Sequence, residues 1–381
     1  SHESQRAIDF WQKAAQKASR ASAYQEAVNH LQRGLDLLAG LPPGDERDVR
    51  ELELRLPLAT MLIALKGAGS PEVENTYGRA LDVCSRLPQS PLHFAAFWGW
   101  WRISMNFRTG RERAESLLRL AEGLGEPGLV LQAHHSLWAT NFMLGDHDAC
   151  LHHIAEGLAL YEEHQHASLS SIYGGHDIRV CAEGEAALSL WLSGHSQEAL
   201  LRIGIATDCA RRLAHAGSIA HALDYAVVLN RYRRRPEEVA RLADAMIRFA
   251  EDRGLGDYIG KGRLFRGWAM AMLGDAHAGM QDLIDGLAAQ RASGTPEDFP
   301  VYFDMLAEAF LAAGRYEDGL LQVEEALAVG AKSGIRYWDA ELYRRKAALL
   351  LAADEGGAAA AEACLNRALG VSRQQGARML E

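Results

Sequence analysis

The sequence predicts an all-α protein built from consecutive helical hairpins, and three observations lead to this prediction. The pattern of residues 267–289 returns about 40 residues later at 307–329. The chain is rich in Ala, Leu, Glu and Arg, which favour helices. No segment alternates apolar and polar residues with the period of two that a half-buried strand requires.

The repeated stretch itself has the organisation of a hairpin. Gly274 ends a first apolar helix and supplies the turn. Gly279, Leu283 and Gly286 then fall on one stripe of a second helix, where small residues allow close approach. Gly314 takes the turn position in the next copy. This small–large–small spacing resembles the second helix of a tetratricopeptide (TPR) repeat. The resemblance implies an α-solenoid, a right-handed superhelix of about nine hairpins.

The remaining elements follow in order along the chain. We expect a first helix at 7–20 and a second that begins after a cap at Ser22. A third is expected at 45–66 with a kink at Pro57, and a fourth begins at Pro71, directly after the cap Ser70. The expected hairpin turns are 109–110, 145–146, 194–195, 234–236, 274, 314 and roughly 356. A polar, glycine-bearing insertion at 163–177 is expected to be a loop.

The same pattern sets the expected domain organisation. Residues 1–6 resemble an expression-tag scar and a disordered start, and residues 7–381 form one array. A sub-boundary is expected near the 163–177 loop. The chain has the character of a fragment of a longer protein.

The order of motifs adds a more specific resemblance. The segments that carry it are AYQEAVNHLQRGLDLLAGLP (23–42), KGAGSPEVENTYGRALDVC (66–84), YGGHDIRVC (173–181), ALSLWLSGHSQEAL (187–200), RGWAMAMLGD (266–275), LAEAFLAAGRYEDGL (306–320) and YWDAELYRRKAALLL (337–351). Together they resemble the C-terminal helical region of bacterial regulators that combine an adenylate or guanylate cyclase domain with a P-loop ATPase. Some relatives carry a winged-helix DNA-binding domain instead. The resemblance implies a non-catalytic regulatory or sensor module inside a larger signalling protein.

Charge and composition exclude several classes of partner. The net charge of −10 argues against binding of nucleic acid or anionic membranes by this region. No apolar run approaches the ~20 residues that span a bilayer. The five cysteines are scattered, which is typical of reduced thiols in a cytoplasmic protein. The sequence contains no GxxxxGK[ST] motif and no cyclase-type metal aspartates, so we expect no catalytic residue and no cofactor.

Histidines are dense between residues 134 and 176. They are His134, His135, His147, His152, His153, His164, His166 and His176, beside Cys150. Histidines one helical turn apart can bind zinc, but two pairs here are adjacent in sequence and no HExxH motif occurs. We therefore predict surface or capping histidines and no metal site.

The loop residues Tyr173, His176 and Asp177 allow two interpretations. They could orient a ligand or a proton, because two glycines give this loop unusual backbone freedom. Alternatively, Asp177 caps the helix that begins at Ile178 and Tyr173 packs on a neighbouring hairpin. The second interpretation is favoured.

Two further clusters are also open to a structural and a functional interpretation. Phe94, Phe97, Trp98 and Trp101 have the spacing of a helical core stripe, which is favoured over a base-stacking or ligand-cage role. Arginines at 231 and 233–235 form either a solvated helix end or an anchor for an acidic partner.

A partner site is predicted on the concave wall formed by the first helices of successive hairpins. Counting back from the turns places nine residues there: His135, Phe142, Trp191, His221, Asp224, Arg231, Lys261, Trp268 and Glu308. Aromatic and charged residues of both signs suit a protein or peptide partner, the protein's own N-terminal domains, or a small effector. The alternatives are a stand-alone scaffold or oligomerisation protein and, less favoured, an enzyme that uses His176 and Asp177.

Overall fold

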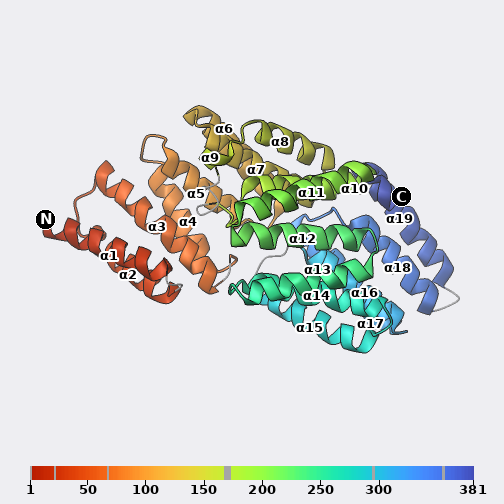
Figure 1. The fold of residues 1–381 in the computed structure, drawn as a ribbon. Helices are drawn as coiled ribbons and strands as arrows, with labels where there is room; N and C mark the ends of the chain where they lie inside the picture. Colours follow the sequence, from red (N-terminus) through yellow and green to blue (C-terminus); the bar gives the residue numbers. More distant parts are fainter. Residues whose placement is uncertain (1, 21–22, 67, 167–172, 294–296, 354–356) are drawn as a thin grey trace. The chain divides into compact units, whose positions relative to one another are not determined.

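The structure is a computed structural model of the 381-residue chain, and it describes every residue except 1, 21–22, 67, 167–172, 294–296 and 354–356. The fold is all-α and TPR-like, as predicted, and the described residues contain no strand (Figure 1). The helices are α1 (His2–Arg20), α2 (Tyr24–Ala39), α3 (Asp45–Lys66), α4 (Pro71–Cys84), α5 (Pro91–Arg102), α6 (Phe107–Leu124), α7 (Pro127–Leu144), α8 (His147–Ala159), α9 (Glu163–His166), α10 (Ile178–Leu192), α11 (Ser196–Leu213), α12 (Ala216–Tyr232), α13 (Pro236–Glu251), α14 (Gly256–Met272), α15 (Ala276–Ser293), α16 (Phe299–Ala312), α17 (Tyr316–Ser333), α18 (Asp339–Ala353), α19 (Ala358–Gln375) and the 3₁₀ turn η3 (Arg378–Leu380). No described helix is both long enough and apolar enough to cross a membrane.

Most local signals in the sequence correspond to observed helix boundaries. α3 spans the predicted residues with Pro57 inside it, and α4 begins at Pro71 directly after Ser70. Ser70 occupies the cap position but makes no side-chain cap hydrogen bond. α1 begins at His2 and so includes residues assigned from the sequence to a disordered start. The cap predicted at Ser22 and the turn near 356 lie outside the described residues.

One sequence prediction about turns is wrong, and a second is refined. Thr109 and Gly110 lie inside α6, because Asn106 begins this helix: its Oδ1 accepts hydrogen bonds from the backbone N–H groups of Arg108 and Thr109 at 3.0 and 3.3 Å. The expected loop at 163–177 contains the one-turn helix α9. Residues 167–172 of that segment lie outside the described residues.

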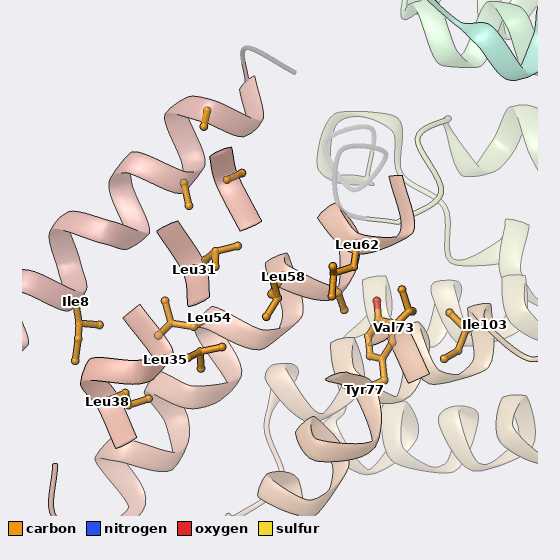
Figure 2. Close-up of a cluster of buried hydrophobic side chains, with 14 of the residues drawn as sticks. Ile8, Leu31, Leu35, Leu38, Leu54, Leu58, Leu62, Val73, Tyr77 and Ile103 are labelled. Atoms are coloured by element: carbon orange, nitrogen blue, oxygen red, sulfur yellow. The ribbon is translucent and has the colours of Figure 1, made fainter. Parts of the chain in front are cut away.

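The chain divides into two compact units. Unit 1 holds residues 1–105 and 112–136 with a short piece at 293–295, and unit 2 holds 106–111, 137–292 and 296–381. This division differs from the sub-boundary expected near 163–177. Inside unit 1, α1 to α4 pack around a cluster of buried aliphatic side chains that includes Leu31, Leu54 and Val73 (Figure 2).

Within unit 2, glycine contacts set the spacing between the paired helices α14 and α15. A Cβ atom added at Gly267 would lie 2.5 Å from the Gly279 carbonyl oxygen, and one added at Gly279 would lie 2.4 Å from the Gly267 carbonyl oxygen. The helices touch backbone to backbone at this point. The sequence predicted this close approach from the position of Gly279 in its stripe.

The segment that leads into α18 packs against the end of α7. The backbone N–H of Arg336 donates to the Met143 carbonyl at 2.7 Å, and Gln375 Nε2 donates to the Arg336 carbonyl at 2.8 Å. The rings of Phe142 and Tyr337 lie 4.8 Å apart. These contacts join residues from the beginning and the end of the unit.

We predict that Gly279→Ala destabilises the protein by about 1–3 kcal/mol, because the added methyl group overpacks two backbones that cannot move independently. Chemical denaturation followed by circular dichroism measures the loss. Gly204→Ala is the matched control: Gly204 lies in α11 with nothing within 4 Å of an added Cβ. That substitution should be neutral or stabilising by up to about 1 kcal/mol. Equal effects of the two substitutions would contradict the assigned contact.

Candidate functional site

All nine residues predicted for the concave wall lie on the first helix of a pair, as the count from the turns required. His135 and Phe142 are on α7, Trp191 on α10, and His221, Asp224 and Arg231 on α12. Lys261 and Trp268 are on α14, and Glu308 is on α16. Six of them are buried, whereas Trp191, His221 and Lys261 are half-buried. Their role in binding a partner stays a prediction.

Five of them, Asp224, Arg231, Lys261, Trp268 and Glu308, lie in two layers along α12, α14 and α16 of unit 2. Asp224 and Arg231 are seven residues apart on α12, as are Lys261 and Trp268 on α14. Seven residues are two helical turns, so each pair shares one side of its helix. We call the group around Lys261 the lysine layer and the group around Glu308 the arginine cluster.

The lysine layer centres on one ammonium group held by two carboxylates. Lys261 Nζ lies 2.9 Å from Asp224 Oδ2 and 3.1 Å from Asp298 Oδ2. The Tyr302 hydroxyl donates to Asp298 at 3.2 Å, and the ring centroid of Tyr258 is 5.9 Å from Nζ. Asp298 remains one-third exposed, so solvent reaches this layer.

Charge and burial act together on the ionisation of this layer. Burial, together with the nearby Asp298 carboxylate, raises the pKa of Asp224 to about 6, against the lowering effect of Lys261. Burial acts to lower the pKa of Lys261, but its carboxylate neighbours Asp224 and Asp298 help to hold that pKa well above the ordinary value. Lys261 is therefore protonated at neutral pH, whereas Asp224 loses its proton near pH 6.

The loop at residues 173–177 joins the lysine layer. The ring of His176 stacks on that of His221 with 3.8 Å between centroids, and the Asp177 N–H donates to Ser218 Oγ at 2.8 Å. Asp177 also caps α10, accepting from the N–H groups of Arg179 and Val180. The capping interpretation of Asp177 is thus confirmed, and Tyr173 is buried.

A buried carboxyl group lies on α10 beside this layer. Glu185 is 5% exposed and accepts a hydrogen bond from the Tyr225 hydroxyl at 3.0 Å. Burial raises the pKa of Glu185 to about 8, and the charges of Glu297 and Asp298 add to this effect, while the Tyr225 hydrogen bond opposes it. The group is therefore mostly protonated at neutral pH.

The arginine cluster ties α12, α14, α16 and α18 together through one carboxylate. Glu308 Oε2 accepts from Arg231 at 3.0 Å and from Trp268 Nε1 at 2.8 Å, and it pairs with Arg345 at 2.9 Å. Glu308 Oε1 accepts from Arg234 at 2.6 Å.

A second carboxylate, that of Asp304, binds two of the same arginines. Its oxygens accept from Arg231 at 2.8 Å, from Arg345 at 2.9 Å and from Trp338 Nε1 at 3.2 Å. Apart from Arg234, the charged members are at most 4% exposed.

The cluster depends on mutual compensation of charge. Burial acts to raise the pKa of Glu308, but Arg231, Arg345 and Arg234 outweigh it and hold that pKa well below the ordinary value. Buried ion pairs add little net stability compared with apolar packing, whereas removal of one partner costs about 3–5 kcal/mol. The cluster therefore fixes an arrangement of helices more than it stabilises the fold.

Arg234 breaks a local rule to reach this cluster. Four other turns between paired helices in the described part of unit 2 place Gly145, Gly194, Gly274 or Gly314 at positive φ, and Arg234 takes that place with φ of 54°. A residue with a Cβ costs about 1 kcal/mol or more in this conformation. Its guanidinium group is half exposed and contacts Glu308. The strained turn directs this side chain to the cluster.

Sequence comparisons relate the chain to a longer protein. No protein-family model matches the sequence. An uncharacterized protein of Rhizobium meliloti (strain 1021) is 35% identical over 382 residues, which cover 98% of this chain. The chain spans only 36% of that protein's length.

Solved structures with the same fold include complexes with peptides. A Rap protein complexed with competence and sporulation factor has a TM-score of 0.68 at 14% identity, covering 98% of this chain and 100% of that one. The Rap conjugation gene regulator of plasmid pLS20, in complex with a Phr peptide, has a TM-score of 0.61 at 11% identity, covering 98% and 96%. The apo form of RapI has a TM-score of 0.58 at 11% identity, covering 75% and 98%. At such identities the likeness shows the fold alone.

Several residue-level expectations need correction. Arg231 is not part of a solvated helix end, because it lies 1% exposed between Asp304 and Glu308. Not all the histidines are at the surface, since His134, His135, His147 and His166 are buried. In the aromatic stripe Phe94 and Trp98 are buried, whereas Phe97 and Trp101 are half-buried.

The sequence reasoning missed Asp298, Tyr302, Asp304, Trp338 and Arg345. Asp304 offered one usable signal, because a carboxylate inside the largely apolar run 299–312 needs a buried partner. Arg345 and Trp338 gave no such signal, because both fit the amphipathic helical pattern of residues 337–351.

We predict that Glu185→Gln flattens the pH dependence of stability. A glutamate in the unfolded chain titrates near pH ~4.3, so between about pH 4.3 and 8 the folded state holds a proton that the unfolded state has lost. Wild-type stability therefore falls as pH rises through this window. Between about pH 6 and 8, denaturant titrations should show the wild type losing about 2 kcal/mol more than the variant.

The exposed carboxylate of Glu198 on α11 provides the control for this measurement. Glu198→Gln should keep the wild-type slope. Identical slopes in the wild type and Glu185→Gln would mean that Glu185 is ionised in the folded protein.

Proposed function

We propose that this chain is a non-catalytic regulatory module that binds a peptide or an extended protein segment at the lysine layer. The observation that carries the proposal is the composition and exposure of that layer. The layer brings together three charged groups, those of Lys261, Asp224 and Asp298, from three successive hairpins or the residue next to one. These groups are largely removed from water, yet solvent still reaches Asp298. Such groups fix the orientation of a bound chain, and the neighbouring Tyr258 and Tyr302 provide aromatic contact area.

The comparisons support a peptide as one class of ligand for this fold. The Rap conjugation gene regulator and NprR, which share the fold, were solved with peptides bound, and another Rap protein was solved with competence and sporulation factor; the TM-score to NprR is 0.50. A charged layer formed by several parallel helices suits an extended segment, because successive hairpins can contact successive residues of the bound chain. The stacked pair His176–His221 borders the same layer and extends the surface available to a ligand.

The module is proposed to act within a longer signalling protein, because its curated relative is much longer than this chain. Only the motif resemblance supports a cyclase–ATPase or winged-helix output domain in that longer protein. The reading frame upstream of Ala7 tests this context directly. A stand-alone scaffold would instead show self-association without a peptide ligand.

A random phage-displayed peptide library provides the probe for binding. We predict that the purified chain enriches a sequence class whose synthetic members bind with one-to-one stoichiometry by calorimetry. Asp224→Asn should weaken that binding tenfold or more, about 1.4 kcal/mol, because it removes the charge that positions Lys261.

Asp208→Asn is the matched control, since Asp208 is an exposed residue of α11 that pairs with Arg211. It should bind as tightly as the wild type. Enriched peptides that bind Asp224→Asn and the wild type equally would place the site elsewhere, and a library without enriched peptides would refute peptide binding.

A further inference from the structure

We propose that the arginine cluster is a latch that holds the facing sides of α12, α16 and α18 together, and that its release admits a partner beyond the lysine layer. The second half of this proposal rests on the proposed function. The latch itself is a property of the unliganded protein.

The first argument is geometric. α12 and α16 belong to non-consecutive hairpins, with α14 between them in the chain. Arg231 nevertheless reaches Asp304 and Glu308, 73 and 77 residues away in sequence. Next to it, the Tyr232 ring stacks on Trp338 at 4.6 Å. Long side chains, and not the backbones, therefore close the space between these helices.

The second argument concerns the chemistry of the closure. Apolar side chains would fill such a space with no desolvation penalty, and they would hold it shut permanently. Arginines and carboxylates recover their hydration when the helices separate, which offsets much of the lost attraction. A space filled by charge can therefore open at lower cost than an apolar core.

The third argument is the placement of Arg234. This residue adopts a left-handed conformation that glycine takes in four comparable turns among the described residues of unit 2, and its guanidinium group is half exposed while it contacts Glu308. Among the cluster's charged members it is the one that solvent reaches. Local strain retained for a single ion pair is expected where that contact must form and break. Arg234 is thus the movable member of the latch.

Glu308→Gln tests the latch in the absence of any ligand. The amide is nearly isosteric and can still accept from Trp268, but it no longer neutralises three arginines. Hydrogen exchange followed by mass spectrometry should show amides of residues 225–232 and 299–312 exchanging at least tenfold faster, while those of α13 and α17 stay within twofold. The control Glu238→Gln, which removes an exposed carboxylate paired with Arg241, should leave all rates unchanged.

Two results would overturn the latch. Unchanged protection of residues 299–312 would mean that the cluster holds nothing closed, and a uniform increase over all helices of unit 2 would mean that it supports only global stability. If Glu308→Gln does not fold, Arg234→Gly replaces it, because this variant removes only the half-exposed member and relieves backbone strain. At least threefold faster exchange at 299–312 is then expected, and unchanged exchange refutes the proposal.

Peptides from the library screen separate the two proposals. A ligand that requires the open state should bind Glu308→Gln at least threefold more tightly, because the variant no longer has to break the latch. Local exchange as predicted, with no peptide enriched by the screen, would leave the latch standing and refute peptide binding. Peptide binding that depends on Asp224, with exchange unaltered in Glu308→Gln, would refute the latch alone.

Discussion

The carboxylate of Glu308 is the group on which the arrangement of helices in unit 2 depends. It accepts from or pairs with side chains of α12, α14 and α18 and of the turn that follows α12. A buried carboxylate is tolerated only when donors and cations surround it. Each of these helices supplies one such partner, so a displacement of any of them would leave the carboxylate uncompensated. Backbone contacts such as that between Gly267 and Gly279 set the spacing inside a hairpin. The carboxylate sets how first helices of different hairpins face one another.

The two layers differ in how completely their charges are enclosed. In the arginine cluster, Arg231 and Arg345 are matched by Asp304 and Glu308, and all four are sealed from water. In the lysine layer, one ammonium group faces two carboxylates, and solvent still reaches Asp298. The first arrangement suits holding helices together, whereas the second leaves polar groups available to another molecule. On α12 and α14 the members of the two layers are seven residues apart, about two helical turns, so the proposed binding and the proposed closure would involve the same helices.

Much of the fold could be predicted from the sequence because its causes are local. The apolar stripes and the turn glycines predicted the hairpins, and Pro71 marked the beginning of α4. The prediction was wrong at Thr109-Gly110, where two residues typical of turns sit in the first turn of a helix that Asn106 begins. A helix cap depends on one or two hydrogen bonds, which composition alone does not distinguish from those of a turn.

The sequence by itself determined which helix carries each candidate site residue, because counting from the turns fixes the register of every first helix. It also determined that Asp177 suits a helix cap. Only the tertiary structure decided which of these residues are enclosed. Arg231, in an arginine-rich helix end, has the local sequence of a solvated residue, and its burial depends on carboxylates 73 and 77 residues away. Ion pairs between distant segments leave no trace in local periodicity, since hydrophobic patterning records only which side of a helix is covered and not what covers it.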